Sequence, residues 1–165
     1  MPKAKYQHED FLAIISDDYK GFVLSVHEML LQEKYKPKVQ VTKSTGLQLS
    51  YAEPKVKGVT GIILIFFMRG DKLTIRIYGK NHKAYPNVLN NLPEAVVNQI
   101  DNADNCVKFT NPEKCWNGCI GYEFHINEKH FQKCAVNCFQ FEVDSESMSH
   151  LIELIKSESK ERMAA

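Results

Sequence analysis

The chain has 165 residues and a mass of 19.0 kDa; 44% of its residues are hydrophobic, 25% are charged, and its formal net charge is +1. This is the profile of an ordinary globular chain that can bury a core, which excludes intrinsic disorder, collagen and a coiled coil as descriptions of the whole sequence. A chain so close to neutrality also has no global field to attract nucleic acid or an anionic membrane. Its length favours one domain over residues 1–165.

The sequence contains no pattern typical of export or of membrane insertion. Charged residues soon interrupt the segment that begins at Phe11, so it lacks the apolar stretch of a signal peptide. The longest apolar run is seven residues, Ile62 to Met68, whereas a spanning helix needs about 20. We therefore expect a cytoplasmic protein in a reducing environment, where its five cysteines favour metal binding or free thiols over disulfides.

The first half of the chain predicts one helix followed by four strands. Apolar residues recur at three- and four-residue steps over residues 8–35, which indicates a long helix with a possible break near Gly21 and an end before Pro37. Alternating or continuous apolar patterns then predict strands over residues 38–43, 47–51, 61–68 and 72–78. The run from 61 to 68 is apolar throughout, so we expect it to be a central strand buried on both faces.

The second half predicts helices, a hairpin, a strand and a last helix. Two short helices are expected at 86–91 and 93–103, with Pro93 in a first helical position. A hairpin is expected between the cysteine pairs, a strand at 139–143, a helix from about Ser145, and a frayed tail from Ser157 to Ala165. This order predicts an α+β fold: a single domain with an antiparallel sheet, packed helices and a Cys-rich hairpin. No strand–glycine-loop–helix unit supports a dinucleotide or P-loop site.

Two identically spaced cysteine pairs are the clearest chemical signal. Cys115 and Cys119 form one C-x3-C motif, Cys134 and Cys138 form another, and the predicted hairpin between them would bring the pairs together. Four thiolates in that arrangement suit a closed, tetrahedral structural zinc site without an open position for water. We therefore predict that Cys115, Cys119, Cys134 and Cys138 bind one structural zinc ion, and that residues 106–138 form a metal-stabilised Cys-rich hairpin.

Other interpretations of these residues remain open. The same four cysteines would suit a redox dithiol pair, a metal sensor, or unconnected buried thiols, because cysteine often behaves as a small hydrophobic residue. Cys106 lies outside the paired pattern, and we expect it to be a buried or half-buried free thiol. His125 and His130 flank the predicted hairpin turn. Either histidine could replace a cysteine as a ligand, although a place on the strand surface is the commoner outcome.

Two polar segments carry weaker signals. The loop from Tyr78 to Pro86 contains His82, which could bind an anion or serve in acid–base chemistry, but a solvated loop is the favoured interpretation. Residues 34–57 carry six lysines against one glutamate, a local charge of +5. Lysines often protect an exposed strand edge, and the chain has only three arginines, so we disfavour nucleic-acid binding. The six lysines are Lys34, Lys36, Lys38, Lys43, Lys55 and Lys57.

Several short strings resemble a small uncharacterised family of bacterial cytosolic proteins with paired CxxxC motifs. The likeness rests on the segment Cys115 to Cys138 with the following Phe139-Gln140-Phe141, and on Ser50-Tyr51, Pro54-Lys55 and Arg76-Ile77-Tyr78-Gly79. It would cover the chain from about Tyr19 to Val143. That family has no assigned activity, so the resemblance implies only a bacterial cytosolic setting and a single compact domain.

Taken alone, the sequence favours a zinc-stabilised binding or interaction module. The alternatives are a small enzyme with a site at the His82 loop and a thiol redox or metal sensor. Whether the protein is an enzyme stays open, with a non-catalytic role favoured. No membrane partner is expected, and the sequence does not distinguish a small ligand from a protein partner.

Overall fold

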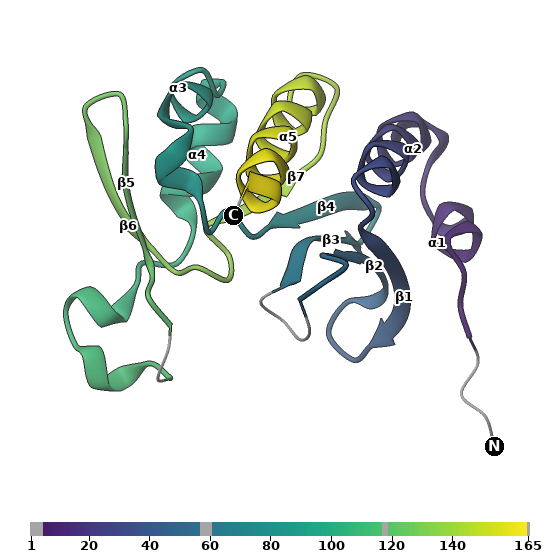
Figure 1. Cartoon of the computed structure of the whole chain (residues 1–165), viewed down its shortest axis with the longest axis horizontal. Coiled ribbons are helices and arrows are strands. Elements are labelled where there is room, and N and C mark those ends of the chain that lie inside the picture. The colour runs from purple at the N-terminus through teal and green to yellow at the C-terminus, as the bar shows by residue number, and fades with distance from the viewer. Residues whose placement is uncertain (1–4, 57–60, 117–118, 165) are drawn as a thin grey trace. The chain divides into compact units, whose positions relative to one another are not determined.

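The computed structural model describes residues 5–56, 61–116 and 119–164, drawn in colour in Figure 1. These residues contain five α-helices, a five-stranded antiparallel sheet and a two-stranded antiparallel sheet, which confirms the predicted α+β class. The chain divides into two compact units. Unit 1 comprises Met1–Ile75 and Glu142–Asp144, and unit 2 comprises Arg76–Phe141 and Ser145–Ala165.

The larger sheet has the strand order β1-β2-β3-β4-β7. Its strands are β1 Lys36–Thr42, β2 Gly46–Ala52, β3 Ile62–Arg69, β4 Lys72–Ile77 and β7 Phe139–Glu142. The strand β3 is the middle strand and its residues 63–67 are buried, as its continuous apolar run predicts. The strand β1 forms one edge, which agrees with the prediction that lysines dress an exposed edge there.

The predicted long N-terminal helix is two helices. The helix α1 spans His8–Ile14 and α2 spans Asp17–Gln32 (Figure 1). The break falls at Ile15 and Ser16 instead of Gly21, because the Ser16 Oγ accepts a hydrogen bond from the Asp18 N–H at 3.3 Å and caps α2. Two aspartates in the first turn of α2 further favour a helix N-terminus at this position.

Aromatic residues join the helices of unit 1 to its strands. Phe11 of α1 and Phe22 of α2 both pack against Phe66 of β3, with ring centroids 6.4 and 6.0 Å apart. All three side chains are buried, and burying each contributes about 1.5–3 kcal/mol. The break at Ser16 lets α1 turn back toward β1 and β2, so its first residue His8 comes close to α2.

Unit 2 contains the remaining helices and the small hairpin. The helices are α3 Pro86–Asn90, α4 Glu94–Asn102 and α5 Met148–Ala164, and the hairpin strands are β5 Tyr122–Ile126 and β6 Lys129–Lys133. The hairpin pairs Tyr122 with Lys133 and Ile126 with Lys129, and it lies between the two cysteine pairs as predicted. Pro93 is the residue before α4 and not its first helical residue.

The expected frayed tail is wrong within the described residues, since α5 continues to Ala164. Its last turns are fixed by buried polar side chains. Glu158 Oε1 accepts a hydrogen bond from Arg162 Nε at 3.0 Å, and Glu158 Oε2 accepts one from the Tyr85 hydroxyl at 2.6 Å. The polar composition of the segment suggests a solvated tail, but two of its charged residues, Glu158 and Arg162, form this buried pair.

The described part of the chain contains no helix that combines the length and apolar character needed to cross a bilayer.

Candidate functional site

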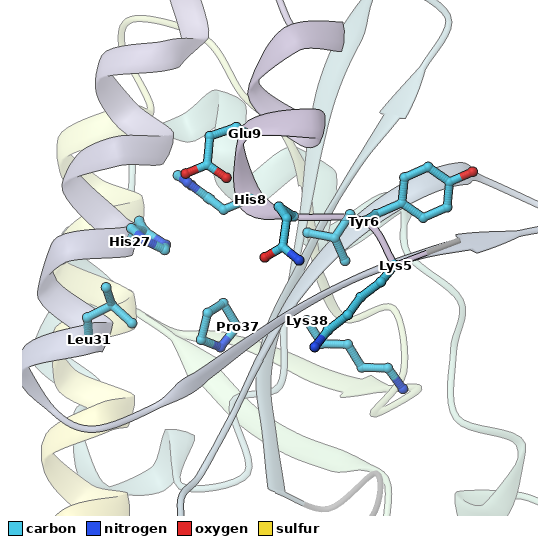
Figure 2. Close-up of a pocket in the computed structure, with 10 residues that line it drawn as sticks. Lys5, Tyr6, His8, Glu9, His27, Leu31, Pro37 and Lys38 are labelled. Atoms are coloured by element: carbon cyan, nitrogen blue, oxygen red, sulfur yellow. The ribbon is translucent and has the colours of Figure 1, made fainter. Parts of the chain in front are cut away.

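Unit 1 contains a pocket of about 620 Å³ between the segment before α1, the helix α2 and the strand β1. Figure 2 shows this pocket with its lining residues as sticks. Two apolar side chains of α2 and β1, Leu31 and Val39, contribute to its wall together with Pro37. The polar lining residues are Lys5, Tyr6, Gln7, His8, Glu9, His27 and Lys38.

Two histidines stack at the pocket wall. Figure 2 shows His8 projecting from α1 and His27 from α2 into the space between these helices. Their ring centroids are 3.7 Å apart and the ring planes differ by 13°. Burial lowers the pKa of both imidazoles, and the proximity of His27 lowers the pKa of His8 further. The nearby Glu9 carboxylate raises the pKa of each ring in part. Near neutral pH the pair is therefore uncharged.

A buried tyrosine supports the second histidine. His27 Nδ1 lies 2.7 Å from the hydroxyl oxygen of Tyr51 on β2, and Tyr51 is fully buried. Burial raises the pKa of Tyr51, so its phenol keeps its proton. His8 differs, because its Nε2 is buried without a hydrogen-bond partner among the described residues. The pocket wall therefore contains one imidazole that is anchored through its Nδ1 and one whose Nε2 is buried without a partner among the described residues.

The charged residues of the pocket are mostly basic. Lys5 and Lys38 contribute two ammonium groups, and Glu9 contributes one carboxylate. Neither ammonium has an ion-pair partner in the described ranges of the chain. With both histidines neutral, the lining carries a net charge of about +1, which favours a ligand with a negatively charged group.

The four cysteines predicted to bind zinc lie in unit 2, and all four are free thiols. Cys119 and Cys138 are buried, while Cys115 and Cys134 are half-buried. The Cys138 N–H donates to the Cys134 carbonyl at 2.9 Å, so this pair is joined by a single helical turn. Burial raises the pKa of the Cys138 thiol. Over residues 5–56, 61–116 and 119–164, the side chains of His, Cys, Asp and Glu form no group of three or more that could hold a metal. Zinc ligation therefore stays a prediction.

Cys106 is buried and free, as expected, and it has a packing role. Gly121 has a φ of +68°, and a Cβ there would lie 2.5 Å from Cys106 Sγ and 3.0 Å from a ring carbon of Phe109. The backbone conformation and the close contact both require glycine at this position. Cys106 thus helps to close the loop that carries Cys115 and Cys119 back to the start of β5.

The expected solvated loop around His82 is wrong for its central side chains. His82 is only 4% exposed, and its Nδ1 lies 2.8 Å from the Gly79 carbonyl oxygen. Its ring packs against Tyr122 and Phe124, with centroids 4.6 and 5.3 Å apart. The apolar residues that cover the histidine lie in the distant hairpin strand β5, which explains why the polar local sequence suggests a solvated loop.

The remaining sequence candidates lie on surfaces. His125 and His130 face each other across the hairpin, with ring centroids 4.8 Å apart, and both are exposed as expected. His130 Nε2 lies 3.0 Å from a Glu123 carboxylate oxygen. The lysine-rich segment includes Lys36 and Lys38 on the edge strand β1, and Lys57 lies outside the described residues.

The histidine pocket was not identified from the sequence. His8, His27 and Tyr51 are separated by 19 and 24 residues and belong to no local motif. They meet only because α1 turns back at Ser16, which the helical periodicity does not reveal. The available signal is weak: a strand residue, Tyr51, combines a large apolar body with a hydroxyl group that needs a partner when it is buried.

Comparison of the chain with models of protein families, with curated proteins and with solved structures gives no match. The features of this chain that bear on its function are therefore the pocket of unit 1 and the cysteine region of unit 2.

Proposed function

We propose that this protein is a binding protein whose small-molecule ligand occupies the pocket of unit 1. The observation that carries the proposal is the buried, unpartnered Nε2 of His8 beside the stacked His27 ring. A buried polar atom without a partner costs about 1–3 kcal/mol, and a ligand group would recover that cost once the His8 ring turns this nitrogen toward the pocket. Such an atom at a pocket wall therefore favours binding over a purely structural role.

The size and chemistry of the pocket support the same proposal. Its volume of about 620 Å³ falls within the roughly 300–1,000 Å³ of small-molecule sites. Such sites usually combine apolar walls with a few polar groups that orient the ligand. Here Leu31, Pro37 and Val39 provide apolar surface, while the histidines and lysines provide the polar groups.

The test is to fill the pocket and look for loss of binding. We expect a small-molecule fragment library, screened by NMR, to shift the resonances of His8 and His27 in the unchanged protein. Leu31→Trp should abolish these shifts, because the indole would occupy the pocket. Leu24→Trp is the matched control, since Leu24 is also exposed on α2 but does not line the pocket. Binding that survives Leu31→Trp, or its absence from the unchanged protein, would contradict the proposal.

As a second element of the function, we propose that zinc stabilises the Cys-rich hairpin. The turn that joins Cys134 to Cys138 brings two thiols to one end of the hairpin, which supports this idea. Zinc would have to draw Cys115 and Cys119 onto this pair. A site with four thiolate ligands would stabilise structure without hydrolytic chemistry, because no coordination position stays open.

Metal analysis of protein purified without added metal or chelator tests this element. We expect one zinc per chain, lost in Cys119→Ser and kept in Cys106→Ser, which lies outside the proposed ligand set. Hydrogen exchange in Cys119→Ser should increase around residues 106–138 and leave the large sheet protected. Absence of metal, with reversible oxidation of the four thiols, would instead favour the thiol sensor.

Of the remaining sequence-based proposals, a reducing compartment is compatible with a binding protein, and an enzyme is less so. Five free cysteines favour the cytoplasm or another reducing compartment, because such compartments keep thiols reduced. An enzyme that uses the His82 loop is less favoured, since the buried His82 ring is held by the Gly79 carbonyl.

A further inference from the structure

We propose that the ligand of this pocket carries an oxyanion, a carboxylate or a phosphate, and that His27 binds it through an Nε2–H group whose position is fixed by Tyr51. This inference rests on the proposed binding function and deepens it by naming the chemical class of the ligand. It assigns His27 as a binding residue and Tyr51 as a positioning residue that acts through His27.

The first step is the tautomer of His27. Its Nδ1 and the Tyr51 hydroxyl are 2.7 Å apart, and this contact has two possible directions. If His27 Nδ1 donated, the phenolic hydrogen of the fully buried Tyr51 would be left without an acceptor, at a cost of about 1–3 kcal/mol. If Tyr51 donates, both groups are satisfied. The second direction is therefore favoured, and it places the ring hydrogen of His27 on Nε2.

The Nε2–H group of His27 determines which kind of ligand group can bind to it. A neutral imidazole in this form donates from Nε2 and cannot ligate a metal through that nitrogen without changing tautomer. Its natural partner is a hydrogen-bond acceptor. The His8 ring stacks on His27 with centroids 3.7 Å apart, and its own Nε2 is buried, so His27 is the imidazole assigned to the ligand.

The third step is charge. Lys5 and Lys38 line the same pocket and attract an anion, whereas the single carboxylate of Glu9 opposes it only in part. The stacked histidines stay neutral because each is partly buried and because a second positive ring at this distance would be repelled. The lysines therefore supply the attraction for the anion, and His27 supplies directional recognition.

The experiment combines a tautomer measurement with binding of defined probes. In protein labelled with ¹⁵N-histidine, we expect His27 to be the Nε2–H tautomer at neutral pH. Tyr51→Phe should give a mixture of tautomers, while Tyr19→Phe, which removes a hydroxyl elsewhere in unit 1, should leave His27 unchanged. Inorganic phosphate and acetate should both shift the His27 signals. The probe that binds with the higher affinity shows whether the ligand carries a phosphate or a carboxylate.

The affinity of the stronger probe should fall roughly three- to tenfold in Tyr51→Phe, the loss expected when one hydrogen-bond donor is no longer held in position. Lys38→Ala should also weaken binding. An Nδ1–H tautomer in the unchanged protein would overturn the inference, as would a Zn²⁺ ion or a neutral fragment that binds while both anions do not. In those last two cases the pocket still binds a ligand, so the proposed function stands. If no probe and no fragment binds, the oxyanion inference and the proposed binding function both fail.

Discussion

Each unit of this protein contains a histidine close to a tyrosine, and the two regions differ in how their polar atoms are satisfied. In unit 2, the Tyr85 hydroxyl donates to Glu158, the nearby His82 is held by the Gly79 carbonyl, and aromatic rings cover the histidine. In unit 1, the Tyr51 hydroxyl contacts His27, but the stacked His8 keeps an unpartnered nitrogen beside a pocket.

The difference separates a structural polar cluster from a candidate binding site. Burial and a lowered histidine pKa occur in both regions, so neither property identifies function here. The distinguishing feature is the open volume that the two stacked histidines line in unit 1. Substitutions in the unit 2 cluster should therefore mainly lower the stability of the protein. Substitutions in the unit 1 pocket should mainly weaken ligand binding.

The largest effect is expected from Glu158→Ala. The Glu158 side chain is fully buried and accepts hydrogen bonds from Arg162, Tyr85 and Asn81. Its removal leaves a buried guanidinium without its carboxylate, which should lower the free energy of unfolding by about 3–5 kcal/mol. Denaturant titration measures the change. Glu153→Ala on the exposed face of α5 is the control, with an expected change of about 0.5 kcal/mol or less.

Smaller effects are expected when His82 of the unit 2 cluster and His8 of the unit 1 pocket are replaced. His82→Gln should destabilise the protein by about 1–3 kcal/mol, because it disturbs a buried ring and its hydrogen bond to Gly79. His8→Gln should change stability by only about 0.5 kcal/mol, because its Nε2 has no partner to lose. Thermal denaturation of both variants provides the measurement. Equal destabilisation would show that His8 is also a structural residue and would remove the contrast between the regions.

The smallest effect concerns pH. Burial lowers the pKa of His82, while the carbonyls of Gly79 and Glu123 raise it in part. Above a pH of about 6.5 neither state binds this proton; below that value the unfolded chain binds it first, so stability falls as the pH falls toward the folded pKa. Between pH 7 and pH 5, His82→Gln should therefore lose less stability than the unchanged protein. An equal slope in both proteins would show that His82 makes no contribution.

Local patterns predicted most elements of this fold. The apolar run of β3, the alternation of β1, β2 and β4 and the hairpin of β5 and β6 all lie close to their expected positions. The errors occur where one polar side chain decides the outcome: Ser16 caps a helix in the middle of an apolar stripe, and Arg162 anchors the end of α5 on Glu158. Periodicity records apolar positions and does not reveal such single hydrogen bonds.

The candidate site was much less predictable than the fold. Neighbouring residues in the sequence identified the cysteine pairs, whereas the pocket joins His8, His27 and Tyr51 from three separate elements. The His82 loop shows the converse problem, because its polar sequence suggests a surface and the covering rings come from β5. In both cases the decisive contacts are distant in sequence.

The contacts of Arg162 determine the order in which the two units can fold during synthesis. Its guanidinium donates to the carbonyl of Tyr78, 84 residues earlier, and its partner Glu158 accepts from the Asn81 N–H, 77 residues earlier. At roughly 5–20 residues per second, the ribosome makes Arg162 several seconds after Tyr78. During that time the carbonyl of Tyr78 and the amide of Asn81 must stay hydrated. Unit 2 can therefore complete its core only after α5 has left the ribosome, whereas most of unit 1 is already available to fold.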